Sequence, residues 1–182
     1  MRRLILLALA LTAAVLLIPT VAVADSATHT YLLVMEEPNF GVAANGDQIA
    51  VTVTGEGEFS GHPNAVDAAG EFTHTDSSGN VLATGTWTAT GLINYQSYGC
   101  GEVFGTTIPP DLCGGAVKMS VTLTPNGTSL QLRGILTVFC VIGPHAPQSV
   151  LGPLTEGVTL NVPGIQNFNH SNGGDNRYVQ IS

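Results

Sequence analysis

Three cysteines and five histidines supply most of the side chains in this chain that could bind a transition metal. Cys140 is followed by His145 and Gln148, so a thiol, an imidazole and an amide come from one short segment. A thiolate with two imidazoles and a weak axial ligand is the ligand set of mononuclear copper centres. His62 or His74 would supply the second imidazole. These residues therefore predict, as one alternative, a copper site in which Gln148 is the axial ligand.

The segment from Leu136 to Gln148 resembles the copper loop of cupredoxins, in which a Cys and a His of one loop join an upstream His. This resemblance covers residues 136–148 alone. It implies a β-sandwich that binds copper at one end and transfers electrons, with residues 158–162 as the strand that follows the loop. A cupredoxin-like domain is therefore kept as an alternative to the function predicted below.

The cysteines also allow disulfide bonds. Cys100 and Cys113 most simply pair with each other, which would close a loop at 97–115 and stabilise the fold by about 3 kcal/mol in the loop-entropy model. Cys140 then remains, and it shares the strand parity of Val138, so its thiol would point into the core. Three cysteines allow three pairings, so a bridge from Cys140 to Cys100 or Cys113 stays open as a second arrangement.

The loop at 97–115 is long for a compact domain, and such loops are usually functional or disordered. Its two cysteines favour an ordered loop. The aromatic and proline side chains that would form a recognition surface on it are Tyr98, Phe104, Pro109 and Pro110. We predict that this loop binds a protein or glycan partner.

Carboxylates on adjacent strands allow a second alternative. Glu56 and Glu58 share one face of a predicted strand, and Glu71 lies on the outward face of the next. Two carboxylates that flank a groove can hydrolyse glycosidic bonds when one of them has a raised pKa, so a secreted carbohydrate-active hydrolase remains an alternative. The chain lacks G-x-S-x-G, H-E-x-x-H, P-loop and dinucleotide-binding motifs, which favours a non-enzymatic domain.

The N-terminus has the pattern of a secretory signal peptide. Two arginines, an unbroken apolar run at 4–18 and the small-residue triplet 22–24 follow in that order, so cleavage is expected after Ala24. Residues 4–24 are also long enough to span a bilayer as an uncleaved anchor, but Pro19 and the triplet favour cleavage. The mature protein is therefore predicted to be secreted or in the cell envelope, without a stable membrane anchor.

The mature chain would have 158 residues (182 minus 24), which suits one domain with a sizeable core. Its basic residues are Lys118, Arg133 and Arg177, and they stand against all 13 acidic residues, a net charge of 3 minus 13, or −10. Such an acidic chain has few groups to neutralise phosphates, which argues against nucleic acid or anionic lipid as a partner.

Nearly every periodic segment alternates apolar and polar residues with the period of a half-buried strand. The predicted strands lie at 31–35, 48–59, 66–72, 81–89, 117–123, 130–138, 158–162 and 177–181. No segment after residue 24 has the period of a long helix.

Turn residues join these strands as neighbours in sequence. Asn-Gly and related pairs at 76–80 and 125–127 tolerate positive φ and favour hairpins, a longer hairpin loop is predicted at 171–176, and residues 37–47 form a predicted loop. We therefore predict one all-β domain at 25–182, an antiparallel β-sandwich or up-and-down β-barrel of roughly eight to ten strands.

Overall fold

The computed structural model of the protein describes residues 28–43, 50–147 and 156–182. The predicted signal peptide at 1–24 lies outside these ranges, and so does Gln148. Within the described ranges, the protein has no helix of the length and apolar character needed to cross a membrane.

Twelve strands are found among the described residues, and four of them are only two or three residues long. In chain order the strands are β1 (Thr30–Val42), β2 (Ala50–Ser60), β3 (Ala65–Thr75), β4 (Val81–Cys100), β5 (Glu102–Val103), β6 (Thr106–Thr107), β7 (Leu112–Pro125), β8 (Leu132–Cys140), β9 (Gly157–Val162), β10 (Gln166–Phe168), β11 (His170–Ser171) and β12 (Asp175–Gln180). Their pairings are antiparallel, and the predicted all-β class is confirmed. Eight longer strands remain, in agreement with the predicted number.

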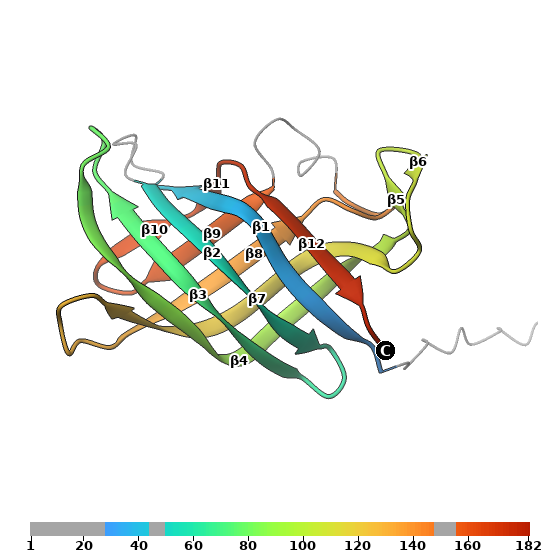
Figure 1. Ribbon diagram of the computed structural model, residues 1–182, viewed down its shortest axis with the longest axis horizontal. Coiled ribbons are helices and arrows are strands. Elements are labelled where there is room, and N and C mark those ends of the chain that lie inside the picture. The colour runs from blue at the N-terminus through green and yellow to red at the C-terminus, as the bar shows by residue number, and fades with distance from the viewer. Residues whose placement is uncertain (1–27, 44–49, 148–155) are drawn as a thin grey trace, which may run out of the picture.

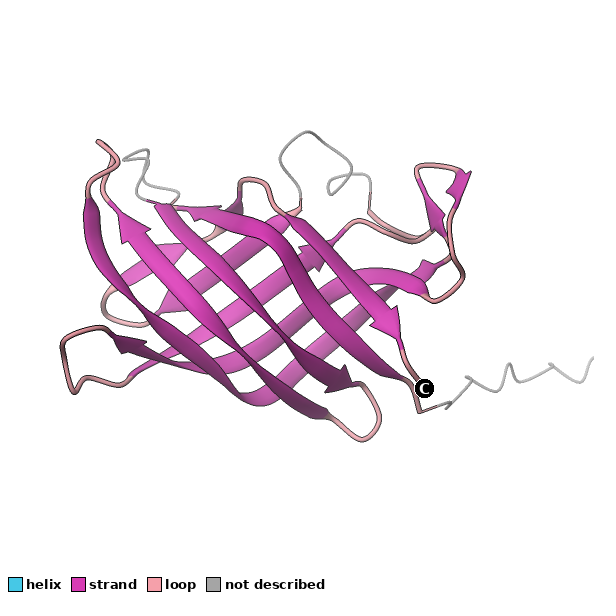
Figure 2. Ribbon diagram, in the orientation of Figure 1, coloured by secondary structure: helices cyan, strands magenta, loops and turns pink. Residues whose placement is uncertain are grey.

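The main sheet closes on itself. Hydrogen-bonded pairs link β1, β2, β3, β4 and β7 in that order, and β12 pairs with both β7 and β1. From β7 the sheet also continues through β8 and β9 to β10. The result is a barrel-like wall of slanted strands (Figures 1 and 2). This ring of pairings favours the barrel-like member of the two predicted architectures.

The largest difference from the predicted boundaries lies in β4. This strand runs for 20 residues and ends at Cys100, whereas the alternation of the sequence ends at residue 89. Its second half pairs with β7 through three register shifts. Each bulge moves the next side chain to the other face and so hides the two-residue period. The predicted loop at 97–115 is therefore shorter, because its first and last residues belong to strands.

A second correction concerns the predicted loop at 37–47. The structure places residues 37–42 in β1, which continues past a register shift between Met35 and Asn39. The bulge turns the Asn39 side chain inward, where it is fully buried. The remainder of the predicted loop from residue 44 lies outside the described residues.

Trp87 fills the middle of the barrel, where it is 1% exposed. Its ring lies over Gly55, at which an added Cβ would be 2.5 Å from Trp87 Cζ2, so only glycine leaves room for the ring. The indole Nε1 donates a hydrogen bond to the Thr54 carbonyl at 2.9 Å. Because the centre is packed, binding surfaces must lie at the two ends of the barrel or on its outer face.

Candidate functional site

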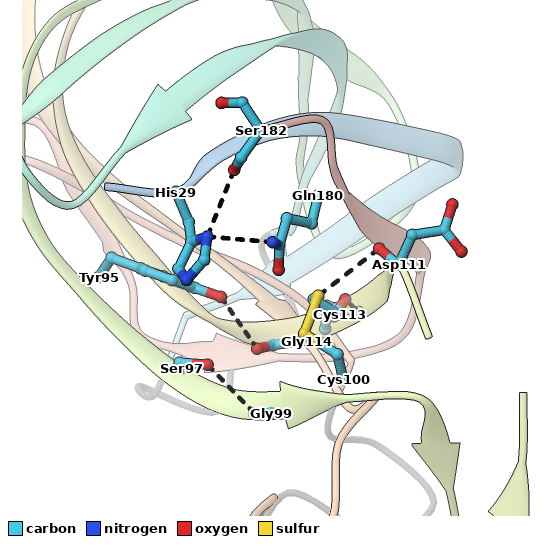
Figure 3. The surroundings of a disulfide bond; sticks show 11 residues. His29, Tyr95, Ser97, Gly99, Cys100, Asp111, Cys113, Gly114, Gln180 and Ser182 are labelled. Atoms are coloured by element: carbon cyan, nitrogen blue, oxygen red, sulfur yellow. Dashed lines mark hydrogen bonds between the residues drawn. A yellow bond between two sulfur atoms is a disulfide. The ribbon is translucent and has the colours of Figure 1, made fainter. Parts of the chain in front are cut away.

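The predicted disulfide between Cys100 and Cys113 is present. The two residues lie directly opposite each other in the β4–β7 register, at the point where the two strands leave the barrel wall (Figure 3). Residues 101–112 protrude between them and are called the clipped loop below. Figure 1 shows the clipped loop, with its strands β5 and β6, at one end of the barrel.

The clipped loop contains a small hairpin. Glu102 and Val103 of β5 pair with Thr107 and Thr106 of β6, so Phe104 and Gly105 form a two-residue turn. The φ angles of these two residues are 49° and 78°, which is the signature of a type I′ turn. Phe104 is 68% exposed. The tip of the loop therefore presents a solvated aromatic ring on a left-handed backbone position.

Backbone hydrogen bonds hold the clipped loop in place. Gly101 N donates to Leu112 O at 2.9 Å, and Ile108 N donates to Gly101 O at 3.0 Å. A third bond ties the loop to the barrel, because Gly143 N donates to Glu102 O at 2.7 Å. With the disulfide, these bonds fix both ends of the hairpin and leave its tip free of the wall.

Tyr98 and Phe104, predicted together as a recognition surface, lie in different environments. The Tyr98 side chain is buried at 3% exposure, and burial raises its pKa. Its carbonyl accepts a hydrogen bond from His145 N at 2.9 Å. Pro109 and Pro110 are exposed, like Phe104. Tyr98 is thus placed to anchor the loop, and the accessible part of the predicted surface is Phe104 with the two prolines.

An aromatic cluster packs inside the barrel near the disulfide. The ring of Phe59 lies 5.1 Å from that of Tyr31, 4.8 Å from that of Tyr95 and 5.2 Å from that of Tyr178, between centroids. The Tyr95 hydroxyl donates to the carbonyl of Gly114, next to Cys113, at 3.2 Å (Figure 3). The strand ends that carry the clipped loop therefore rest on a packed aromatic base.

The third cysteine is a buried free thiol, as the parity of its strand predicts. The alternative bridge from Cys140 to Cys100 or Cys113 does not form. The Cys140 sulfur donates to the Asn176 carbonyl at 3.0 Å, and burial raises the pKa of the thiol far above its ordinary value. Since the thiolate is the form that attacks substrates and binds metals, this thiol is chemically unreactive in the native fold.

The structure separates the side chains of the predicted copper set. Cys140 is buried, whereas His145 and His62 are exposed, and His62 lies in the turn between β2 and β3. The other upstream candidate, His74, lies on β3. Gln148 is outside the described residues. Among the residues that the structure describes, no three His, Cys, Asp or Glu side chains come together at a position where they could hold a metal ion.

The carboxylates of the hydrolase alternative lie on the outer face of the wall. Glu56, Glu58 and Glu71 are all exposed. Glu58 stands opposite Asp67 and borders a hollow of about 350 Å³, but Glu56 and Glu71 do not line it. Glu56 and Glu71 are offset by two residues in the β2–β3 register, and neither lines this hollow.

A buried polar cluster lies beside Cys140 and is not predicted by any pattern in the sequence. Asn176 Nδ2 donates to Asn39 Oδ1 at 2.6 Å and to Phe139 O at 2.9 Å, and Asn176 N donates to Glu156 Oε1 at 2.9 Å. Burial raises the pKa of Glu156 to about 7. These bonds join β12 to β1, to β8 and to Glu156, the residue before β9, so the cluster ties neighbouring strands of the barrel wall together. Nothing in the alternation of the sequence distinguishes these polar residues from surface ones.

No protein-family model matches the chain, and no curated protein or solved structure does so either.

Proposed function

We propose that this protein is a non-enzymatic, extracytoplasmic binding domain that contacts its partner through the tip of the clipped loop. The observation that carries the proposal is Phe104, an aromatic residue exposed at a position where the backbone φ is positive. Gly, Asn and Asp normally occupy such turn positions, because other residues lose about 1–2 kcal/mol there. Phe104 lowers the stability of the turn and buries little surface, so contact with a partner best explains an aromatic side chain at this position.

The bonds that hold the clipped loop in place suit a role in recognition. A recognition surface binds more tightly when its conformation is fixed before binding, because less entropy is lost. The disulfide, the internal backbone bonds and the bond from Gly143 N to Glu102 O hold the hairpin in one conformation. The exposed phenylalanine at the tip offers apolar contact to a groove on a protein or to the face of a sugar ring, and Pro109 and Pro110 are exposed nearer the base of the same loop.

The location is supported by two features. Disulfides form and persist mainly in oxidising compartments outside the cytoplasm, and the Cys100–Cys113 bond suits such a compartment. The charged start, apolar run and small-residue triplet of residues 2–24 have the order of a secretory signal. Both features favour a domain that works outside the cytoplasm.

The proposal is tested with two matched variants of the full chain, expressed in its own cells with an affinity tag. Phe104→Asn keeps a residue that tolerates positive φ and removes the ring. Leu130→Asn removes an exposed apolar side chain of similar accessibility, 57%, from the connection between β7 and β8. We expect a component that is co-purified with the wild type and with Leu130→Asn to be lost from Phe104→Asn. Equal recovery with all three proteins would contradict the proposal.

A further inference from the structure

A small apolar pocket opens at the end of the barrel away from the clipped loop. In Figure 1 this end carries β10 and the turn between β3 and β4. The pocket has a volume of about 90 Å³. Its walls are mainly buried apolar side chains from the inner face of the barrel, including Val51, Phe72, Leu123, Leu160, Val162 and Phe168.

One nitrogen of this pocket, His74 Nε2, has no hydrogen-bond partner among the described residues. His74 lines the pocket from the inner face of β3, where it stands between Val51 and Ala83 in the strand register. Its ring meets that of Phe168 edge to face, with 5.2 Å between centroids. His74 Nε2 is buried, and none of the described residues bonds to it. Burial also lowers the pKa of His74, so the ring is neutral at neutral pH.

Water is poorly suited to satisfy this nitrogen. A buried water is stable when it makes about two to four hydrogen bonds. Among the described residues that line the pocket, His74 and Gln166 alone have polar side-chain atoms. A water beside Nε2 would therefore lie against apolar carbon on most sides. A group that bonds to Nε2 and is itself attached to an apolar body suits the pocket better.

We infer that this pocket binds a small apolar molecule that carries a hydroxyl group, with the hydroxyl bonded to His74 Nε2. A hydroxyl both donates and accepts, so it satisfies either tautomer of a neutral imidazole. An ionised ligand is disfavoured, because the described lining offers no opposite charge. The volume equals about three waters of liquid, which suits a short aliphatic alcohol of two or three carbon atoms. This inference does not depend on the function proposed for the clipped loop.

The test uses ethanol and propane as probes of matched shape, titrated into the full chain and followed by NMR. We expect saturable shifts of the Val51, Leu123 and Leu160 methyl signals and of the His74 ring with ethanol. His74→Leu should weaken the binding of ethanol about three- to tenfold, the loss expected for one hydrogen bond. Binding of propane should not weaken.

Two further variants keep the test decisive if His74→Leu does not fold. Ala83→Leu fills the pocket from β4 and should abolish the shifts with both probes. Leu82→Ala changes the neighbouring exposed side chain of the same strand and should leave them intact. Absence of saturable shifts would overturn the inference, and so would shifts that persist in Ala83→Leu. Equal affinity for the two probes would also overturn it, because His74 would then play no part.

Discussion

The two ends of the barrel carry different candidate sites. At one end the clipped loop projects the Phe104 ring into solvent on a disulfide-closed hairpin. At the other end an apolar pocket reaches inward to a buried nitrogen of His74. The first site exposes an aromatic ring at a backbone position with positive φ, and the second buries a polar atom that a packed fold would normally satisfy.

The difference arises from how the strands finish. β4 and β7 run past the barrel wall through bulges and carry a hairpin beyond it. At the other end, tight turns such as Asp76–Asn80 and Pro163–Ile165 stop the strands, with Gly79 N bonded to Asp76 O and Ile165 N bonded to Val162 O. Long strand ends thus build a projection, and short ones leave the interior open.

The largest expected effect is a difference in stability between variants of two aromatic residues at the end that carries the clipped loop. Tyr98→Ala should lower the free energy of unfolding by about 4 kcal/mol, since it leaves a cavity beneath the loop. Phe104→Ala should change it by no more than about 0.5 kcal/mol, because the ring is exposed. Urea unfolding of both variants measures the contrast. Equal losses would show that the loop does not divide into an anchor and a free tip.

Removal of the disulfide should have the second-largest effect on stability. Cys100→Ser with Cys113→Ser should lower the free energy of unfolding by about 3 kcal/mol in the loop-entropy model for a closed loop of this length. Hydrogen exchange should rise in residues 101–112. The exchange of β9 and β10, around the far pocket, should stay as in the wild type under native conditions. A rise at both ends would mean that the ends are not independent.

Glu156 in the buried polar cluster, which lies in the wall between the two ends, should make the stability of the fold depend on pH. Its pKa is about 7 in the fold and 4.5 ordinarily, so between these values the native state keeps a proton that the unfolded chain has released. Stability therefore falls as pH rises from 4.5 to 7. Glu156→Gln should remove this fall, with a gain at pH 8 on the order of 1 kcal/mol because the side chain is partly solvated. Thermal unfolding at pH 4.5 and pH 8 measures it, and a wild type with no such fall would contradict the prediction.

The titration of His74 should change the stability with pH in the direction opposite to that of Glu156. Burial lowers its pKa below the ordinary 6.5, so the unfolded chain takes up a proton more readily and stability falls as pH drops through 6.5. His74→Leu should flatten that part of the pH profile. It should also raise stability at pH 7.5 by about 1 kcal/mol, since the unsatisfied nitrogen is gone. A variant with an unchanged profile below pH 6.5 would show that the ring is solvated.

The smallest effect concerns the turn at the tip. Phe104→Gly relieves the positive φ but adds freedom to the unfolded chain, so we expect a net gain in stability of about 0.5 kcal/mol. Partner binding should be lost in the same variant. Calorimetry measures the first and co-purification the second. Lower stability would indicate that the ring packs against the loop.

The sequence predicted those parts of the fold that obey a simple period. β2, β3, β7 and β8 overlap the predicted strands, because most of their residues alternate between buried and more exposed positions. The strand predicted at 130–138 begins only at Leu132, since Leu130 is exposed in the connection before it. Bulges in β1 and β4 were missed because an inserted residue reverses the parity. β10 and β11 were missed because they are two or three residues long.

The candidate sites were predicted only in part. The disulfide followed from the number and spacing of cysteines. The burial of Tyr98 and the exposure of Phe104 could not be predicted in this way. They depend on Gly143 and His145, which lie more than 30 residues away in the chain and bond to Glu102 and Tyr98. His74 carried no signal of an apolar pocket, since the pocket joins β3 to β9 and β10.

Site-specific photo-cross-linking can show whether the tip of the clipped loop contacts a partner. A photoreactive phenylalanine analogue is placed at position 104, or at position 130 as the control, in the full chain expressed in its own cells. We expect a discrete cross-linked product from position 104 and none from position 130. No product from position 104, or the same product from both positions, would mean that the tip is not the contact surface.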